Sequence, residues 1–525
     1  PCTPQSPAVT VEYTVTADAA VCAHLTAAGV DLRCRRWDDP PAIEQPGQLL
    51  VGHTGSYPDA GVIAWCATVS PAAAYERGLD PIGGGVPAPM TLTLAGLIQQ
   101  ALAGEGPATD HLLILHPDGR TERIRLLPRP LPREPPGTSV AVTDGLTAAI
   151  SAAERAVDPV VGIIEAVGEE ASTPLPYYLA QLSAHPMSHA GDRGRLAAGV
   201  DPDWDRAYMR ALGEALERYA ASVYDPDALQ EAPPEAITPA VSLDALVRPS
   251  DAMPGVLPWV RGLDLQTRRP TAVPAGLVYH PPPGPPLRPP ITTGLALARS
   301  RKAAIHSGLL EVLERDAVMR MWYGEAAVHR VTVESATMQA LAARLRAADL
   351  SVACWATPTD VGVPVCVAAV HRTTDYPYCA FGSAAAVEPH DAAMHAVTEA
   401  TQNWMELDAM GPEASADTYE GVARYAADPR PAFEFLPGSA TAAPLEAVLA
   451  VAPDDLDPLV DRLAQEELTA VAVSVTTGDL RALGFEAVRV VIPAAQPLFV
   501  RDPYFGDRVS SDAAAIHARR PHPFP

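Results

Sequence analysis

Three stretches of the chain repeat one spacing of polar residues. In each, a polar residue is followed four positions later by a glutamate, and three positions after that by a glutamate or glutamine. The residues are Arg210, Glu214 and Glu217, then Ser307, Glu311 and Glu314, and finally His395, Glu399 and Gln402. Because positions three and four apart lie on one face of an α-helix, the spacing predicts three helices, each with a short polar row.

The residue types in these rows indicate which chemistry they could support. If the three helices converge, five carboxylates face one cavity, and they could not all ionise there unaided. Mg²⁺ binds carboxylate oxygens and shares its remaining positions with substrate phosphates. Each row alone is also typical of a solvated helix face, since glutamate is a good helix former. The threefold recurrence favours a magnesium–nucleotide site without a glycine-rich loop.

The same segments have the apolar periodicity of helices that pack against a core. We expect helices over residues 201–223, 302–321 and 391–406. In the first two, an apolar stripe is offset from the polar row by about half a turn. Its members are Leu212, Leu216, Tyr219 and Val223, and Ile305, Leu309, Leu313 and Met321. Arg218 and Arg315 each follow the second glutamate, and we interpret them as ion-pair partners that orient those carboxylates.

The composition is that of an acidic globular protein. Hydrophobic residues make up 48% of the chain and charged residues 19%, and the formal net charge is −25. Lys302 is the one lysine in the sequence. This balance disfavours binding to nucleic acid or to an anionic membrane. No apolar run approaches the roughly 18 residues of a membrane helix, and no targeting segment is recognisable, so we expect a cytoplasmic protein.

Cysteine and histidine patterns give no second candidate site. The seven cysteines form no CxxC pair, which disfavours a zinc site and favours small buried residues. His185 and His189 are four apart, but Pro186 biases the chain away from a helix there. We interpret these two histidines, with His306 and His371, as hydrogen-bonded structural residues.

Two α/β units are expected, separated by proline-rich sequence. The first unit spans residues 1–127. Within it, residues 11–120 alternate short strand-like and helical stretches, such as VEYTV (11–15), TLAGLIQQALAG (93–104) and HLLILHP (111–117). Residues 128–137, beginning PRPLPREPP, are typical of a stiff linker. Residues 138–525 form the larger α/β unit, in which HPPPGPPLRPP (280–290) predicts an extended surface loop.

The polar rows and their surroundings resemble the YcaO family of ATP-dependent peptide-backbone modifying enzymes. The resemblance covers roughly residues 140–525 and rests on ALGEALERYA (211–220), ITTGLALARSRKAAIHSGLLEVLERDAV (291–318) and AFGSAAAVEPHDAAMHAVTEATQ (380–402). The final PHPFP (521–525) resembles the tail of the subgroup that forms azoline rings. Residues 1–127 resemble a reduced ThiF-like domain by strand–helix alternation and position alone, which implies a docking role.

The resemblance implies ATP- and Mg²⁺-dependent cyclodehydration of a ribosomal precursor peptide. A Cys, Ser or Thr side chain attacks the preceding carbonyl, ATP phosphorylates the resulting oxyanion, and loss of phosphate leaves a thiazoline or oxazoline. It implies metal and nucleotide binding by Glu214, Glu217, Glu311, Glu314 and Glu399, with Gln402 as their partner. The carboxylate of Pro525 is the candidate base.

The resemblance also implies partners. A separate leader-peptide-binding ThiF-like protein is expected to act with the chain, and a homodimer is compatible with the family. Oxidation of azolines to azoles would need a flavin-dependent dehydrogenase as another protein, because no flavin motif is present in the sequence.

Departures from the family pattern leave two hypotheses open. Arg210 stands where serine is usual, Ser307 where asparagine is common, and His395 where arginine is common. The upstream Gly-Lys-Gly is replaced by Ala197-Ala198-Gly199. In the first hypothesis the site works, with Arg210 as a phosphate clamp. In the second, the chain is a degenerate homologue that scaffolds the same biosynthetic complex.

The complete set of carboxylates favours a working site over a degenerate one. A thioamide-forming relative is a third hypothesis, which the PHPFP tail disfavours.

Overall fold

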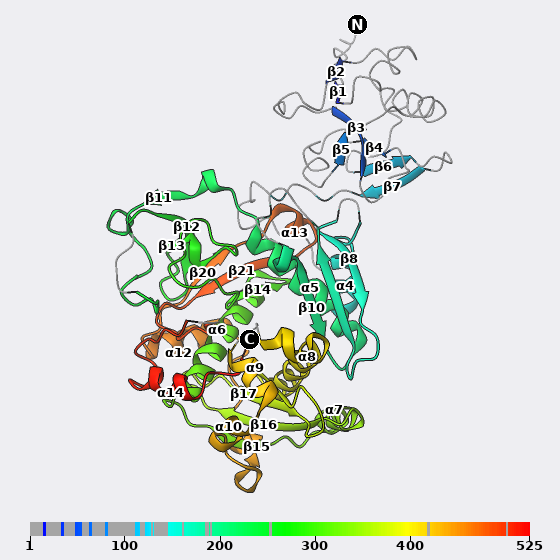
Figure 1. The fold of residues 1–525 in the computed structure, drawn as a ribbon. Helices are drawn as coiled ribbons and strands as arrows, with labels where there is room; N and C mark the ends of the chain where they lie inside the picture. The colour runs from blue at the N-terminus through cyan, green and yellow to red at the C-terminus, as the bar shows by residue number, and fades with distance from the viewer. Residues whose placement is uncertain are drawn as a thin grey trace, which may run out of the picture.

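The computed structural model describes most of the chain from residue 145 onward (Figure 1). The described residues are 145–159, 162–183, 188, 192–250, 255–416, 420–499 and 502–524, with Leu127, Pro130 and seven N-terminal strands. Among them, no helix is long and apolar enough to cross a membrane.

The N-terminal strands form one mixed sheet in the order β2-β1-β3-β4-β6-β7, with β5 on β3. They are β1 (Thr14–Thr16), β2 (Arg33–Arg35), β3 (Gln48–Thr54), β4 (Val62–Trp65), β5 (Leu79–Pro81), β6 (His111–Leu115) and β7 (Thr121–Arg125). Strand β6 lies within the expected 111–117, and β1 overlaps the expected 11–15 at Thr14 and Val15. The expected helix at 93–104 lies outside the described residues, and the likeness to a ThiF-like domain stays a prediction.

Three further sheets build the larger unit, which confirms the expected α/β class. A three-stranded antiparallel sheet contains β8 (Ile164–Glu169), β9 (Tyr177–Leu182) and β10 (Leu196–Val200). A six-stranded sheet contains β11 (Gln230–Ala232), β12 (Leu257–Asp264), β13 (Pro270–Pro274), β14 (Leu295–Ala298), β20 (Val471–Ser474) and β21 (Glu486–Val491). A five-stranded sheet contains β15 (His329–Thr332), β16 (Ser351–Thr357), β17 (Val365–His371), β18 (Cys379–Ala385) and β19 (Ala443–Pro444).

Helices cover and connect these sheets. They are α4 (Leu146–Glu154), α5 (Trp204–Ser222), α6 (Arg301–Trp322), α7 (Ala336–Ala347), α8 (Pro389–Ala416), α9 (Glu420–Ala427), α10 (Arg430–Phe435), α11 (Leu445–Val448), α12 (Leu456–Gln465), α13 (Gly478–Ala482) and α14 (Ala513–Arg519). The proline-rich segment 280–290 has no regular structure, and its residues 284–286 are exposed.

The three predicted helices are α5, α6 and α8, and side-chain caps fix the start of the first two. The Asp203 carboxylate accepts from the Arg206 amide, and the Ser300 hydroxyl accepts from the Ala303 amide. Such caps satisfy amides that have no partner inside the helix. The third helix extends well beyond the expected 391–406, because nothing breaks it before Gly411, where the φ angle of 73° marks a kink.

The apolar stripes predicted for the first two helices are buried, as expected. Helix α5 packs on β10, α6 packs on β14 and β21 and also reaches β18, and α8 packs on β18 and β17. A side chain at Gly199 in β10 would place its Cβ 2.2 Å from the Ala211 amide nitrogen, so this glycine permits the close approach of α5. Helix α6 thus joins the six-stranded sheet to the five-stranded sheet.

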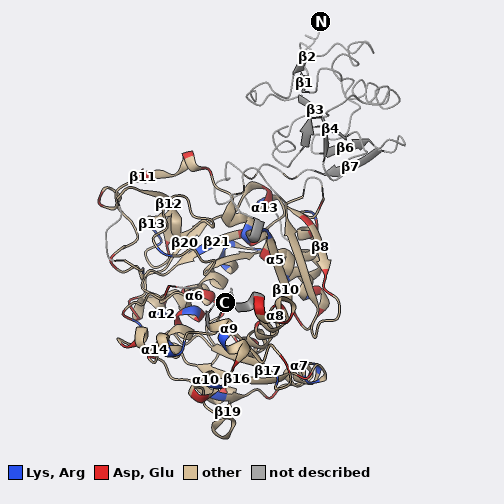
Figure 2. Cartoon of the chain, in the orientation of Figure 1, with Lys and Arg blue, Asp and Glu red and all other residues tan. Residues whose placement is uncertain are grey.

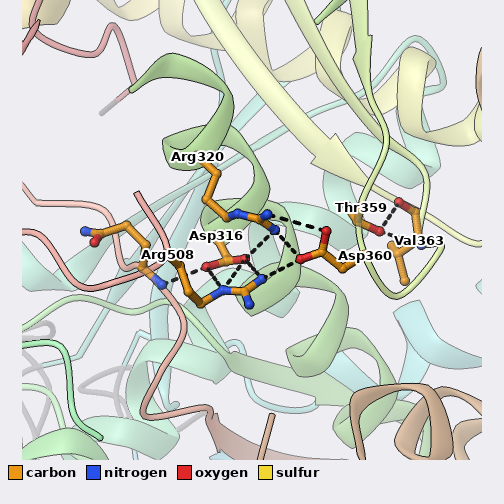
Figure 3. A network of polar contacts seen from close by, with 7 residues as sticks. Asp316, Arg320, Thr359, Asp360, Val363 and Arg508 are labelled. Atoms are coloured by element: carbon orange, nitrogen blue, oxygen red, sulfur yellow. Dashed lines mark hydrogen bonds and ion pairs between the residues drawn. The ribbon is translucent and has the colours of Figure 1, made fainter. Parts of the chain in front are cut away.

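An ion-pair network fixes the C-terminal half of α6 (Figure 3). Buried Asp316 accepts from the Gln496 amide at 2.8 Å and from Arg508 Nη2 at 2.8 Å. Asp360, in the loop between β16 and β17, accepts from Arg320 Nη1 at 2.5 Å and from Arg508 Nη2 at 3.1 Å. The network ties α6 to this loop and to Gln496 and Arg508.

Candidate active site

The first part of the site lies where α5 meets α6 and β14. Glu217 is within electrostatic range of Glu214 on its own helix and of Glu311 on α6, and it accepts a hydrogen bond from the Leu297 backbone. Glu311 accepts a hydrogen bond from the Gly294 amide at 2.9 Å. Two of the predicted rows therefore meet here.

The second part lies between α6, α8 and β18. Glu314 accepts from the Ser383 hydroxyl at 2.7 Å and from the Ala385 amide at 3.0 Å, and Glu399 accepts from the Ser383 amide at 3.3 Å. The Arg315 guanidinium lies 3.5 Å from Glu314 Oε1 and 3.8 Å from Glu399 Oε1. Ser383 and Arg315 therefore hold one carboxylate from each helix, and the third row joins the cluster.

Figure 2 shows acidic positions on both α6 and α8 in the middle of the described body. Desolvation raises the pKa of Glu311 and of Glu399 to about 7, although the charge of Arg315 opposes the shift in both. Desolvation and the charges of Glu214 and Glu311 raise the pKa of Glu217 well above its ordinary value. Grouped acids of this kind gain from a hard divalent cation, which favours their ionised forms.

A cavity of about 640 Å³ opens beside α6 and the first turns of α8. Four of the predicted polar residues line it: Ser307, Glu311, Glu314 and His395. His306, Glu388, Asp391 and Asp454 also line it, and the sequence did not single out any of these for a site. Its described lining contains no lysine or arginine, so an anionic ligand in this cavity would require cations as counter-charge.

Arg210, Gln402 and Arg218 do not line this cavity, and each forms a polar contact elsewhere. Arg210 Nε lies 3.0 Å from Asp201 Oδ2, with the Arg210 side chain 42% exposed. Gln402 Nε2 donates to Glu406 Oε1 at 3.0 Å. Arg218 is an ion-pair partner as predicted, but of the first glutamate of its row, since its Nε lies 2.6 Å from Glu214 Oε1.

The residues present suit Mg²⁺ bound together with phosphate groups. Among the described residues, no three His, Cys, Asp or Glu side chains are already arranged as ligands of one ion. Mg²⁺ in nucleotide sites commonly takes only one or two protein carboxylates, with water and phosphate oxygens completing its shell. Glu217 and Glu311 from one pair of helices, and Glu314 and Glu399 from the other, supply oxygen donors of that kind.

The C-terminal tail packs into the same region. Phe524 is buried against Trp322 and Phe381, the buried His522 ring bonds to the Phe499 carbonyl through Nε2 at 2.8 Å, and Tyr425 donates to the Pro521 carbonyl at 3.0 Å. Desolvation lowers the pKa of His522 to about 4, and the nearby charge of Arg315 contributes to the shift. Pro525, the predicted base, lies outside the described residues.

Several residues that contact the predicted site residues could not be recognised from the sequence. Ser383 lies in a buried strand, and Asp201 and Glu406 lie outside the repeated spacing. Arg489 is a buried residue of β21 that donates to the carbonyl groups of Leu277, Thr292 and Ile291. Its charge acts on Glu217 and Glu311. The only sequence signal for Arg489 is a charged residue inside an apolar strand, EAVRVV.

The histidines and cysteines follow the sequence interpretation in part. Cys354, Cys366 and Cys379 are buried thiols, as expected. His306, interpreted as structural, lines the cavity instead. His185 and His189 lie outside the described residues.

A family model described as YcaO cyclodehydratase, ATP- and Mg²⁺-binding, matches residues 198–496. The chain therefore belongs to the YcaO family, as the motifs suggested, and the cofactors of that family are ATP and Mg²⁺. An uncharacterised protein of Methanothermobacter thermautotrophicus is 28% identical over 221 residues, which is 39% of this chain and 56% of the relative. The chain thus spans little more than half the length of this curated relative.

Solved structures share the fold. A heterocyclase in complex with substrate and cofactor matches with a TM-score of 0.72 at 18% identity, over 97% of this chain and 83% of the other. The heterocyclase TruD matches with a TM-score of 0.64 at 16% identity, over 97% and 81%. The YcaO protein of Methanopyrus kandleri bound with AMPPCP and Mg²⁺ matches with a TM-score of 0.51 at 24% identity, over 63% and 86%.

Proposed function

We propose that the chain is an ATP- and Mg²⁺-dependent cyclodehydratase that converts Cys, Ser or Thr residues of a ribosomal precursor peptide into thiazolines or oxazolines. The observation that carries the proposal is the convergence of α5, α6 and α8. These helices bring carboxylates of the three polar rows within electrostatic range of one another, and Glu311 and Glu314 of α6 line the cavity. The pKa values of Glu311 and Glu399 are raised to about 7. Membership of the YcaO family supports the choice of nucleotide and metal.

In this proposal Glu214, Glu217, Glu311, Glu314 and Glu399 bind the metal ions. Bound Mg²⁺ would neutralise phosphate charge and favour transfer of a phosphoryl group to an amide oxygen. Ser307 and His395, which line the cavity, contact the nucleotide, and Gln402 supports the same site. Arg210 contributes less to nucleotide binding in this proposal, because its guanidinium is already paired with the Asp201 carboxylate.

The reaction also needs a protein group that accepts protons from the peptide. The peptide nucleophile and the amide must each lose a proton, and a positioned carboxylate is suited to accept it. We assign this role to the carboxylate of Pro525, because the tail before it packs against Trp322 of α6 and is within electrostatic range of Arg315. A leader-peptide-binding ThiF-like protein would deliver the peptide, and a flavin-dependent dehydrogenase would oxidise the rings.

Mass spectrometry of a Cys- and Ser-containing precursor peptide tests the proposed reaction. With Mg–ATP and the leader-binding partner, we expect the peptide to lose one water for each ring and one phosphate to be released for each water lost. A Glu314→Gln variant should form no rings, whereas Glu325→Gln, a change at a residue just after α6 that does not line the cavity, should match the wild type. No ATP consumption by the complete mixture would contradict the assignment and support the scaffold hypothesis. Phosphate release without loss of water from the peptide would contradict the proposed ring formation.

A further inference from the structure

The polar row of α8 continues one turn beyond Gln402 to a carboxylate that the family spacing does not include. Glu406 is four positions after Gln402, so both side chains lie on one face of the helix. Glu406 Oε1 accepts a hydrogen bond from Gln402 Nε2 at 3.0 Å. The pair is partly buried, where a fixed hydrogen bond is worth more than on an exposed helix face.

Two other elements meet the same carboxylate. The hydroxyl of Tyr177, a buried residue of β9, acts on Glu406 as a side-chain hydrogen-bond partner. The charge of Arg218 on α5 also acts on Glu406, and the same guanidinium is paired with Glu214 at 2.6 Å. Glu406 of α8 therefore interacts with Tyr177 of β9 and lies within electrostatic range of Arg218 of α5.

The direction of these hydrogen bonds determines which atom of Gln402 is left available. Gln402 Nε2 is the donor in this pair, so the amide nitrogen of Gln402 faces Glu406. Desolvation raises the pKa of Glu406, and the hydrogen bonds of Gln402 and Tyr177 and the charge of Arg218 oppose that shift. The amide oxygen of Gln402 is then the atom turned away from Glu406, and a carbonyl oxygen is a suitable ligand for a hard cation or an acceptor for a nucleotide hydroxyl.

We propose that Glu406 is a positioning residue of the site, which fixes the Gln402 side chain with its amide oxygen available to the metal–nucleotide complex and couples it, through Arg218, to Glu214. The proposal rests on the proposed function, because it assigns a role toward the same bound Mg–nucleotide. It differs from a purely structural role, since exchanging the two side chains should restore the arrangement. In the exchanged pair, an amide at position 406 would donate to a carboxylate at position 402, whose second oxygen would remain available.

Calorimetric titration of Mg²⁺ into the full chain with AMPPCP tests this role, alongside thermal unfolding of the ligand-free protein. We expect Glu406→Gln to weaken the apparent Mg²⁺ affinity roughly 10- to 100-fold, the usual effect of losing a residue that orients a ligand. The double variant Gln402→Glu with Glu406→Gln should recover most of that loss. The control Asp408→Asn changes an exposed carboxylate two positions further along α8 and should leave the affinity unchanged.

The possible results separate this inference from the proposed function. Absence of AMPPCP binding by folded wild-type protein would overturn both. Normal binding by wild type and by Glu406→Gln would overturn the role of Glu406 alone. A double variant no better than the single one would also overturn it, as would variants that lower the unfolding temperature without changing the Mg²⁺ affinity. Recovery of the Mg²⁺ affinity in the double variant would support the positioning role of Glu406.

Discussion

At the scale of single residues, the site combines acids that are close together with few groups that compensate their charge. Arg315 lies between Glu314 and Glu399, and Arg218 is paired with Glu214. Glu217 and Glu311 instead accept hydrogen bonds from the backbone amides of Leu297 and Gly294. The ligand-free protein therefore keeps part of the cluster protonated near neutral pH, and metal binding must displace those protons.

The first prediction concerns pH. The pKa of Glu311 and of Glu399 is about 7 in the folded protein, above the ordinary value of 4.5. Both groups stabilise the ligand-free fold below pH 4.5, and that contribution is lost as the pH rises through about 7. Mg–nucleotide binding should respond in the opposite direction and strengthen up to about tenfold per pH unit for each proton released.

Calorimetry in buffers of different ionisation enthalpy measures the protons released on Mg²⁺ binding. We expect release at about pH 6 and little release at about pH 8. Binding that is independent of pH over this interval would show that the raised carboxylates do not take part.

The second prediction concerns Ser383, which donates to two acids through two different atoms. In Ser383→Ala the amide bond to Glu399 remains, but the hydroxyl bond to Glu314 is lost inside the protein. We expect about 1–3 kcal/mol lower stability to urea, together with weaker Mg–nucleotide binding. Ser439→Ala, at an exposed position, is the matched control. Equal urea midpoints for the two variants would exclude this role of Ser383.

At the scale of elements, the helices were predictable and the sheets largely were not. Helical periodicity is local, so the apolar stripes and polar rows of α5 and α6 could be located to within a few residues. The sheet order β11-β12-β20-β21-β14 joins strands far apart in the chain, such as those that pair Leu263 with Ala472. Pairings of this kind depend on the tertiary fold. Arg489 lies on β21 of this sheet, and Ser383 lies on β18, against which α6 and α8 pack. Their contacts with the predicted carboxylates therefore depend on the tertiary fold and could not be foreseen.

The third prediction concerns Gly294, which lies in the loop between the proline-rich segment and β14. Its φ angle is 85°, and a Cβ there would lie 2.3 Å from the Val490 carbonyl oxygen. Gly294→Ala should destabilise the protein by more than about 1 kcal/mol and weaken nucleotide binding, because the Gly294 amide donates to Glu311. Gly168→Ala, where a Cβ meets nothing within 4 Å, should have little effect in the same unfolding assay. Similar losses in both variants would contradict the prediction.

At the scale of the whole molecule, segments far apart in sequence hold the tail beside the site. Trp322 at the end of α6 donates from Nε1 to the Arg520 carbonyl at 3.1 Å, and Arg520 Nη2 donates to the Trp322 carbonyl at 2.6 Å. The sequence indicated a functional tail through PHPFP, but not the aromatic cluster that receives Phe524. That cluster is formed from α6, β18 and α9, which only the complete fold brings together.

The fourth prediction separates the structural and chemical roles of the tail. Phe524→Ala should lower the free energy of unfolding by about 3–5 kcal/mol, because it removes a buried ring. Deletion of Pro525 alone should change stability much less but reduce peptide-dependent phosphate release by roughly 100-fold or more, since it displaces the terminal carboxylate. Full activity after the deletion would exclude the carboxylate of Pro525 as the base.

The central claim, that three helices form one magnesium–nucleotide site, is tested most directly by calorimetry of Mg–ATP binding to the wild type and to Glu214→Ala with Glu311→Ala. We predict about micromolar affinity for the wild type and for the control Glu325→Ala, lost in the double variant and in every sample without magnesium. Folded wild-type protein that fails to bind ATP with magnesium, or a double variant that binds as well as the wild type, would contradict the account.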